Sequence, residues 1–321
     1  MSAAAGAPVA PRRRRRLGLK LALLATALLL PLLCCELFLQ FVDPGDFGEL
    51  EDRERFSATV LEHVEWEGAR RLRLVPGAVG SYLGHEVHIS AQRLRNRPVV
   101  VPKPADVCRV VVLGDSVPFG WGVGEDDPFP RQLEVLLRDH PRRDGRRYEV
   151  VNAGTPGWGL VEAGFWLRDE GLALAPDVVL HCIINNDVEP HPKPPPLFLG
   201  EGLRRVRTLR LFERLADKLT ANRGFEPNTG LDAGMIAMVF DRYQELLRPA
   251  GVPYVVFDTV GLPAAAVAHA QAIGLHHFDT VLSLEWQHAH QVTRSDFHPG
   301  VAGHRILAER ALAAVLPLLE R

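Results

Sequence analysis

One serine in this chain directly follows a stretch that is typical of a buried strand. Residues 109–116 read Arg-Val-Val-Val-Leu-Gly-Asp-Ser, and Ser116 is the only one of seven serines that ends such a run. In open parallel sheets, ligands bind beyond the carboxyl ends of the strands, so Ser116 is a candidate nucleophile. The stretch lacks the second glycine of a Gly-x-Ser-x-Gly elbow, which disfavours an ordinary α/β-hydrolase.

Three further polar blocks come where a serine enzyme would need them. Asn152-Ala153-Gly154 follows the next predicted strand, Asn185-Asn186-Asp187 follows the third, and Asp296-Phe297-His298 precedes the last predicted helix. A serine hydroxyl is a weak nucleophile at neutral pH and needs a base such as imidazole to accept its proton. The attacked carbonyl oxygen then gains negative charge, which preorganised N–H donors stabilise.

The acid that would orient the histidine is less clearly marked. Asp296 lies two residues before His298, and in an extended stretch residues i and i+2 project to the same side. Asp296 could therefore orient the imidazole of His298. The alternative is a surface carboxylate, with a backbone carbonyl holding the imidazole in a Ser-His dyad.

These four blocks, in this order within residues 108–315, resemble the SGNH, or GDSL-type, hydrolase family. The resemblance implies a catalytic Ser116 and His298, and an oxyanion hole made by the backbone N–H groups of Ser116 and Gly154 and the side chain of Asn186. It also implies a flavodoxin-like three-layer α/β/α sandwich. The family commonly places its acid three residues before the histidine, where this chain has Ser295, which leaves the role of Asp296 open.

The elements that position these blocks alternate along the chain. Strands and helices in turn are the signature of a parallel sheet covered on both faces. We predict such a domain over residues 105–321, with an insertion at about 190–228, preceded by a linker and a small β-rich lead-in over residues 43–104. The predicted strands are 110–113, 148–151, 177–184 and 252–257, and the predicted helices are 130–138, 162–171 and 304–319.

Residues 1–42 differ in kind from the rest. Five arginines at 12–16 precede an apolar stretch from Leu17 to Cys35, which would span about 28 Å as a helix. We predict a cytoplasmic basic tail and a signal anchor that contacts the membrane through residues 17–42. The positive-inside rule then makes the chain a single-pass protein of the cell membrane with an extracytoplasmic catalytic domain. A cleaved signal peptide, a lipoprotein signal and a twin-arginine signal are the alternatives. This layout also resembles a membrane-anchored bacterial subgroup of the family.

The charge distribution argues against nucleic acid as a partner. The whole chain has a formal net charge of −2, and residues 1–42 contribute +5, so the remainder is acidic. Nucleic-acid binding needs a concentrated basic face. The segment 203–219 does combine an apolar face with arginines, and it could be a packed helix, a lid or a membrane-surface helix.

We expect neither a metal nor another cofactor. The pairs His276-His277 and His288-His290 have no third ligand at a recognisable spacing. Cys108 and Cys182 are predicted to be free, buried thiols. If Cys182 lies level with Val112 on a neighbouring strand, the two cysteines are about 13 Å apart, too far for a disulfide.

The predicted function is that of an extracytoplasmic serine esterase that cleaves an acyl ester of a small molecule or a glycan. An O-acyltransferase or deacylase that acts on a glycan is the first alternative. The second is a catalytically silent binding module, against which the intact Ser116, Gly154, Asn186 and His298 argue.

Overall fold

The computed structural model describes residues 12–42, 47–184, 206–209, 211, 232–294 and 296–320. The chain divides into two compact units, each described by itself below. One comprises Met1–Gly48 with Pro194–Phe225, and the other Glu49–Lys193 with Glu226–Arg321.

A five-stranded parallel sheet forms the centre of the larger unit. Its strands are β5 (Val107–Leu113), β6 (Arg147–Asn152), β7 (Val178–Ile183), β8 (Tyr254–Asp258) and β9 (His276–Asp279). They are hydrogen-bonded in the order β6-β5-β7-β8-β9, and every neighbouring pair is parallel. This order is that of flavodoxin-like sheets, with the switch point between β5 and β7. The predicted fold class is confirmed.

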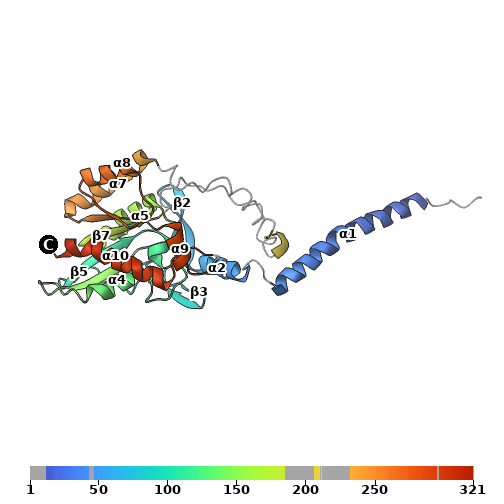
Figure 1. The fold of residues 1–321 in the computed structure, drawn as a ribbon, viewed down its shortest axis with the longest axis horizontal. Helices are drawn as coiled ribbons and strands as arrows, with labels where there is room; N and C mark the ends of the chain where they lie inside the picture. Colours follow the sequence, from blue (N-terminus) through green and yellow to red (C-terminus); the bar gives the residue numbers. More distant parts are fainter. Residues whose placement is uncertain are drawn as a thin grey trace, which may run out of the picture. The chain divides into compact units, whose positions relative to one another are not determined.

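Helices cover both faces of this sheet (Figure 1). One face packs against α5 (Leu160–Trp166), α7 (Ala233–Leu247) and α8 (Ala264–Ala272), and the other against α4 (Phe129–Leu137) and α10 (Val301–Leu319). Successive residues of β5 alternate between the two cores: Val111 and Leu113 face α5 and α7, whereas Val110 and Val112 face α4 and α10. Burial on both faces explains why the strands read as continuous apolar runs.

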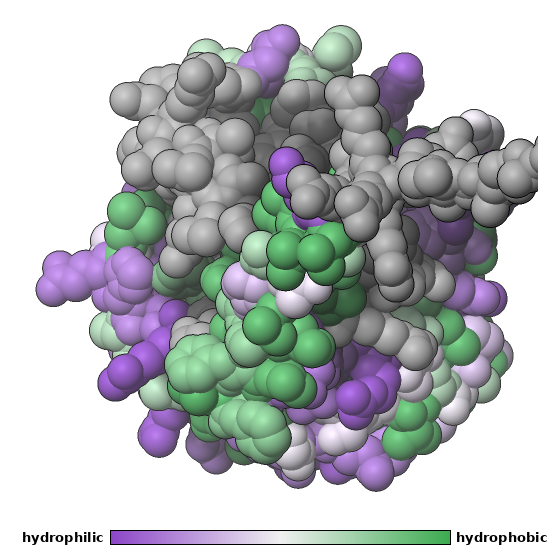
Figure 2. Space-filling view, turned by 90° about the vertical axis from the view of Figure 1, so that its right-hand side faces the viewer, coloured by the Kyte–Doolittle hydropathy of each residue, from purple (hydrophilic) through white to green (hydrophobic). Residues whose placement is uncertain are grey.

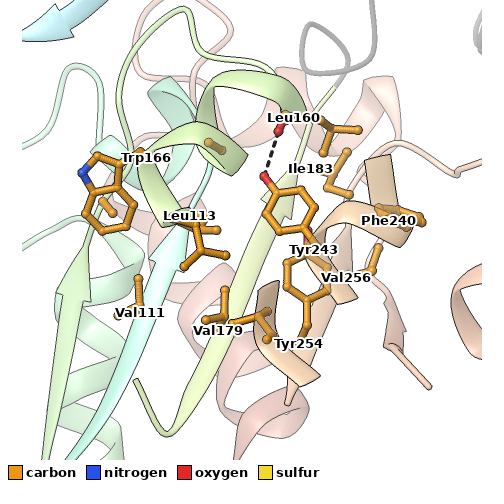
Figure 3. Close-up of a cluster of buried hydrophobic side chains, with 14 of the residues drawn as sticks. Val111, Leu113, Leu160, Trp166, Val179, Ile183, Phe240, Tyr243, Tyr254 and Val256 are labelled. Atoms are coloured by element: carbon orange, nitrogen blue, oxygen red, sulfur yellow. Dashed lines mark hydrogen bonds between the residues drawn. The ribbon is translucent and has the colours of Figure 1, made fainter. Parts of the chain in front are cut away.

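The first of these cores is drawn in close-up in Figure 3. Phe240 and Tyr243 of α7 and Trp166 of α5 pack over the valines of the sheet, and all three side chains are almost completely buried. The hydroxyl of Tyr243 donates a hydrogen bond of 2.8 Å to the carbonyl of Leu160, which satisfies the one polar atom of that side chain.

The residues ahead of the sheet form a helix and two hairpins. These are α2 (Phe47–Val60), the antiparallel pair β1 (Leu61–Trp66) and β2 (Ala69–Leu74), and the antiparallel pair β3 (Val79–Tyr82) and β4 (His85–His88). The hairpins agree with the predicted β-rich lead-in, whereas α2 was not predicted. We call residues 49–104 the lead-in. Its side chains Phe56 and Tyr82 share a buried cluster with Phe119 and Trp121, which follow Ser116.

Several other elements differ from the prediction. Strand β9 and helices α7 and α8 were missed, and the predicted helix over residues 162–171 is α5 followed by a wider π-helical turn, Leu167–Gly171. Cys108 and Cys182 are buried and form no disulfide with each other, as predicted. The expected register was wrong, because Val112 pairs with Leu180 and Leu113 with His181, which puts Cys182 further from Cys108.

In the smaller unit, α1 (Arg12–Val42) is the main element. Its stretch Gly18–Val42 is 25 residues long with a mean hydropathy of 2.3, so by length and composition it could cross a membrane or be a signal sequence. Most leucines of this helix are exposed. Figure 2 shows hydrophobic residues, in green, among hydrophilic ones, in purple, on the surface that faces the viewer.

Near its carboxyl end, α1 binds a short part of the insertion. The carboxylate of Glu36 accepts hydrogen bonds from the backbone N–H groups of Arg207 and Thr208, at 3.1 and 2.8 Å, and from the Thr208 hydroxyl. Apart from residues 206–209 and 211, the predicted segment 203–219 lies outside the described residues, as does most of the insertion.

Candidate active site

A tight turn after β5 presents Ser116 at the switch point of the sheet. Gly114 has φ +138°, and a Cβ there would lie 2.6 Å from the carbonyl oxygen of Cys182, so only glycine fits. Asp115 caps the short helix α3 (Ser116–Phe119) by accepting the Val117 N–H at 3.0 Å. This places Ser116 at the first helical position, beyond the end of a central strand.

Three predicted site residues meet in one hydrogen-bonded row. The Oγ atom of Ser116 lies 2.8 Å from Nε2 of His298, and Nδ1 of His298 lies 2.5 Å from Oδ1 of Asp296. Since a carboxylate only accepts hydrogen bonds, Nδ1 carries the proton, which leaves Nε2 of the neutral ring as an acceptor for the serine hydroxyl. This is the geometry that general-base activation of a serine requires.

Ser116 has a second acceptor within reach. Its Oγ also lies 2.9 Å from Oδ2 of the fully buried Asp115. The hydroxyl has one proton to donate, so Asp115 can take it only when His298 does not. When His298 is protonated on Nε2, it donates to Ser116 and the hydroxyl turns to Asp115.

Asp296 is buried and is held by donors on both oxygens. It is 3% exposed, and Oδ2 accepts hydrogen bonds from the Tyr82 hydroxyl at 3.1 Å and from Nε1 of Trp121 at 3.2 Å. Burial by itself raises the pKa of Asp296, but the hydrogen bonds and charge of His298 outweigh it and lower the pKa to about 2. The carboxylate is therefore ionised at neutral pH and can stabilise an imidazolium.

Gly154 lies at this site, in the loop after β6. Its N–H donates to Oδ1 of Asn152 at 3.0 Å. A Cβ at this position would lie 2.4 Å from the backbone nitrogen of Phe119 and 2.9 Å from the carbonyl oxygen of Asp115. The absence of a side chain at Gly154 therefore lets the loop after β6 pack closely on the turn that carries Ser116.

Asn152 and Arg95 support the same turn, and sequence reasoning gave neither a role. Nδ2 of Asn152 donates to the carbonyl of Pro118 at 2.7 Å. Arg95, 4% exposed, donates to the carbonyls of Phe119, Gly120, Val123 and Gly124. Asn152 belongs to the Asn-Ala-Gly block after a predicted strand, and this position could have marked it as part of the site. No local pattern distinguishes Arg95 from the other arginines of the lead-in.

Asn186, the remaining predicted donor of the oxyanion hole, lies outside the described residues, as does Ser295. The strand that leads to Asn186, β7, pairs directly with β5, which leads to Ser116. No group of three or more His, Cys, Asp or Glu residues that could hold a metal occurs in the described part of the chain.

A model of the GDSL-like Lipase/Acylhydrolase family matches residues 112–306, more than half of the chain. No protein with a curated description matches. Three solved structures with a similar fold are distant in sequence. They are TesA (17% identity, 65% of this chain and 99% of that one, TM-score 0.45), a lipase/acylhydrolase from Enterococcus faecalis (14%, 65% and 95%, 0.41) and the acetyl xylan esterase AlAXEase (17%, 64% and 99%, 0.38).

Proposed function

Because this chain belongs to the GDSL-like lipase/acylhydrolase family and is an ester-cleaving hydrolase, we propose that it works through Ser116, His298 and Asp296 as a serine esterase. The observation that carries the proposal is the row of contacts from Ser116 Oγ to His298 Nε2, at 2.8 Å, and from His298 Nδ1 to Asp296 Oδ1, at 2.5 Å. It supplies a nucleophile, a base and an orienting anion in order.

In the first half of the reaction, Oγ of Ser116 forms a bond to the ester carbonyl carbon while Nε2 of His298 takes the hydroxyl proton. The carbonyl electron pair moves onto oxygen and returns when the bond to the alcohol breaks. His298 gives its proton to the departing alkoxide, which leaves as the alcohol. In the second half, water attacks the acyl-serine, His298 again carries the proton, and the carboxylic acid and free Ser116 result.

We propose that the N–H of Ser116, at the start of α3, and the side chain of Asn186 stabilise the oxyanion. Backbone donors at a strand exit and a neutral amide can do so without adding charge. Gly154 is not included as a donor, since its N–H is bonded to Asn152.

The direct test replaces Ser116 with alanine in the full-length chain. Hydrolysis of a short-chain aryl ester and labelling by a fluorophosphonate probe should both disappear, while the circular dichroism spectrum stays the same. Hydrolysis at the parent rate would refute the mechanism. Absence of labelling in the parent protein would favour a silent binding module. With a sugar acceptor present, acylated sugar among the products would favour transfer over hydrolysis.

We propose further that α1 anchors the enzyme in the cell membrane with its catalytic unit outside the cytoplasm. Support comes from the apolar length of Gly18–Val42 and the arginines at 12–16 that precede it. The protein should remain in bacterial membranes after alkaline carbonate extraction, and external protease should digest its catalytic unit in spheroplasts. Release by carbonate, or protection from the protease, would contradict the anchor or its orientation, respectively.

A further inference from the structure

The carboxylate of Asp296 has a donor on each side. Oδ1 accepts from Nδ1 and from the backbone N–H of His298, at 2.5 and 3.1 Å. Oδ2 accepts from the hydroxyl of Tyr82 and from the indole of Trp121, at 3.1 and 3.2 Å. Rotation of the carboxylate would break bonds on both sides, and a buried carboxylate that loses donors loses their stabilisation. The hydrogen bonds to Oδ2 therefore hold Oδ1 in its orientation toward His298.

Both donors on Oδ2 belong to a buried cluster of aromatic side chains. Tyr82 is 2% exposed, and its ring centroid lies 5.7 Å from that of Phe56 and 5.5 Å from that of Trp121. The Trp121 ring in turn lies 5.8 Å from the ring of His298. Tyr82 and Phe56 come from the lead-in, 214 positions away from Asp296 in the case of Tyr82. The lead-in therefore reaches the row of contacts that ends at Ser116.

We propose that Tyr82 is a positioning residue: its hydroxyl holds Asp296 in the orientation that directs His298 toward Ser116, so that the lead-in is part of the active site. This inference rests on the proposed function of the same three residues. It adds a fourth, which does not touch the substrate and acts only through Asp296.

The hydroxyl of Tyr82 is suited to this role because it keeps its proton. Burial and the negative charge of Asp296 raise the pKa of Tyr82 well above its ordinary value, so it is a donor throughout the working pH range. The other charged groups that face the pair are His298, and Glu49 and Arg53 of α2. The two α2 charges have opposite sign, and neither prevents the phenol from donating.

The test replaces Tyr82 with phenylalanine in the full-length enzyme. The ring, and with it the cluster with Phe56 and Trp121, is kept, and only the donor is lost. We expect loss of this hydrogen bond to a charged group to lower kcat by about 10- to 100-fold. KM should change less than about twofold, since Tyr82 does not contact the substrate. Tyr243→Phe is the matched control: it removes another buried tyrosine hydroxyl, bonded to Leu160, and should leave kcat unchanged.

A double-mutant cycle with Asp296→Asn decides how Tyr82 acts. Rates are measured by aryl ester hydrolysis and by fluorophosphonate labelling of Ser116, which remains measurable in slow variants. If Tyr82 acts through Asp296, Tyr82→Phe should cost less than about threefold in the Asp296→Asn background. The same fold loss in both backgrounds would overturn the proposal, since it would indicate a general structural effect.

The remaining outcomes also separate this inference from the proposed function. An unchanged kcat in Tyr82→Phe would overturn the inference while the Ser-His mechanism stands. The same holds if Asp296→Asn is fully active. An active Ser116→Ala variant, or a parent protein that the fluorophosphonate probe does not label, would remove the mechanism itself.

Discussion

Nδ1 of His298 and Oδ1 of Asp296 lie 2.5 Å apart, although the spacing of these residues in the chain differs by one from the usual spacing of the family. The backbone N–H of His298 donates to the same oxygen at 3.1 Å. The two-residue spacing therefore still brings the carboxylate to Nδ1 of the ring. The intervening Phe297 contacts the ring of His288 instead and is 55% exposed.

This contact predicts the effect of Asp296→Asn. The amide can donate to Nδ1, which would move the imidazole proton to Nε2 and remove the acceptor for Ser116. We expect kcat to fall by at least about 100-fold, with KM little changed, as measured with an aryl ester at pH 7. Ser116→Ala sets the zero of the assay. A fall of less than threefold would favour a Ser-His dyad in which Asp296 is not needed.

Gly154→Ala tests the packing of the two loops at the site. The new Cβ would lie 2.4 Å from the backbone nitrogen of Phe119. A backbone atom cannot rotate away from this contact as the end of a flexible side chain could. The turn that carries Ser116 must shift, so we expect kcat to fall and stability to drop by about 1–3 kcal/mol, measured by urea unfolding in detergent.

The matched control is Gly164→Ala, in the middle of α5. Its Cβ would lie 3.5 Å from the ring of Tyr243, an ordinary van der Waals distance. Replacing a helical glycine with alanine usually stabilises by about 0.5–1 kcal/mol, and activity should not change. If both variants behave alike, Gly154 is not needed for the close approach of the loops.

Two buried histidines predict a loss of stability in mild acid. Burial lowers the pKa of both His181 and His304 to about 3, and the positive charge of Arg95 adds to this at His304. Below pH 6.5 the unfolded chain binds protons that these folded histidines do not, so stability falls as the pH drops toward 3. The loss between pH 7 and pH 5 is about 2 kcal/mol for each histidine.

Asp296 does not contribute to this window. Its pKa of about 2 is below the unfolded value, so its stabilisation is present above about pH 4 and is lost only as the pH falls through 2. Urea unfolding at pH 7 and pH 5 measures the difference. His181→Gln keeps a partner for the Tyr254 hydroxyl, which lies 2.7 Å from the ring, and removes one titrating group. Its pH dependence should be smaller, and an identical slope would contradict the assignment.

The buried ion pair of Arg109 predicts a purely structural variant. Arg109 is 0% exposed, and its Nε donates to Glu149 at 2.5 Å while its other nitrogens bind the carbonyls of Leu174 and Val100. Glu149→Ala would leave the guanidinium buried without its anion, at a cost of about 3–5 kcal/mol. We expect a lower unfolding midpoint in urea and an unchanged kcat per folded molecule. A large fall in kcat at full stability would show a role in the site.

The sequence by itself determined the parallel sheet and the place of Ser116 beyond the end of its strand. Strands buried on both faces must be apolar throughout, and β5 is such a strand. It ends at Gly114, whose φ of +138° favours glycine, and Ser116 follows two residues later. Strand β9 escaped prediction, because at an edge of the sheet His276–Asp279 is only partly buried and carries two histidines and an aspartate.

Only the tertiary structure decided which side chains support the site. Tyr82 donates a hydrogen bond to Asp296, 214 positions away. Arg95 donates to Gly120, 25 positions away, and Asn152 to Pro118, 34 positions away. Periodicity reports the burial of a residue within its own element, whereas these partners are set by how separate elements pack. The same holds for Gly154: its position after β6 was readable, but the direction of its N–H depends on Asn152 and on the backbone of a different loop.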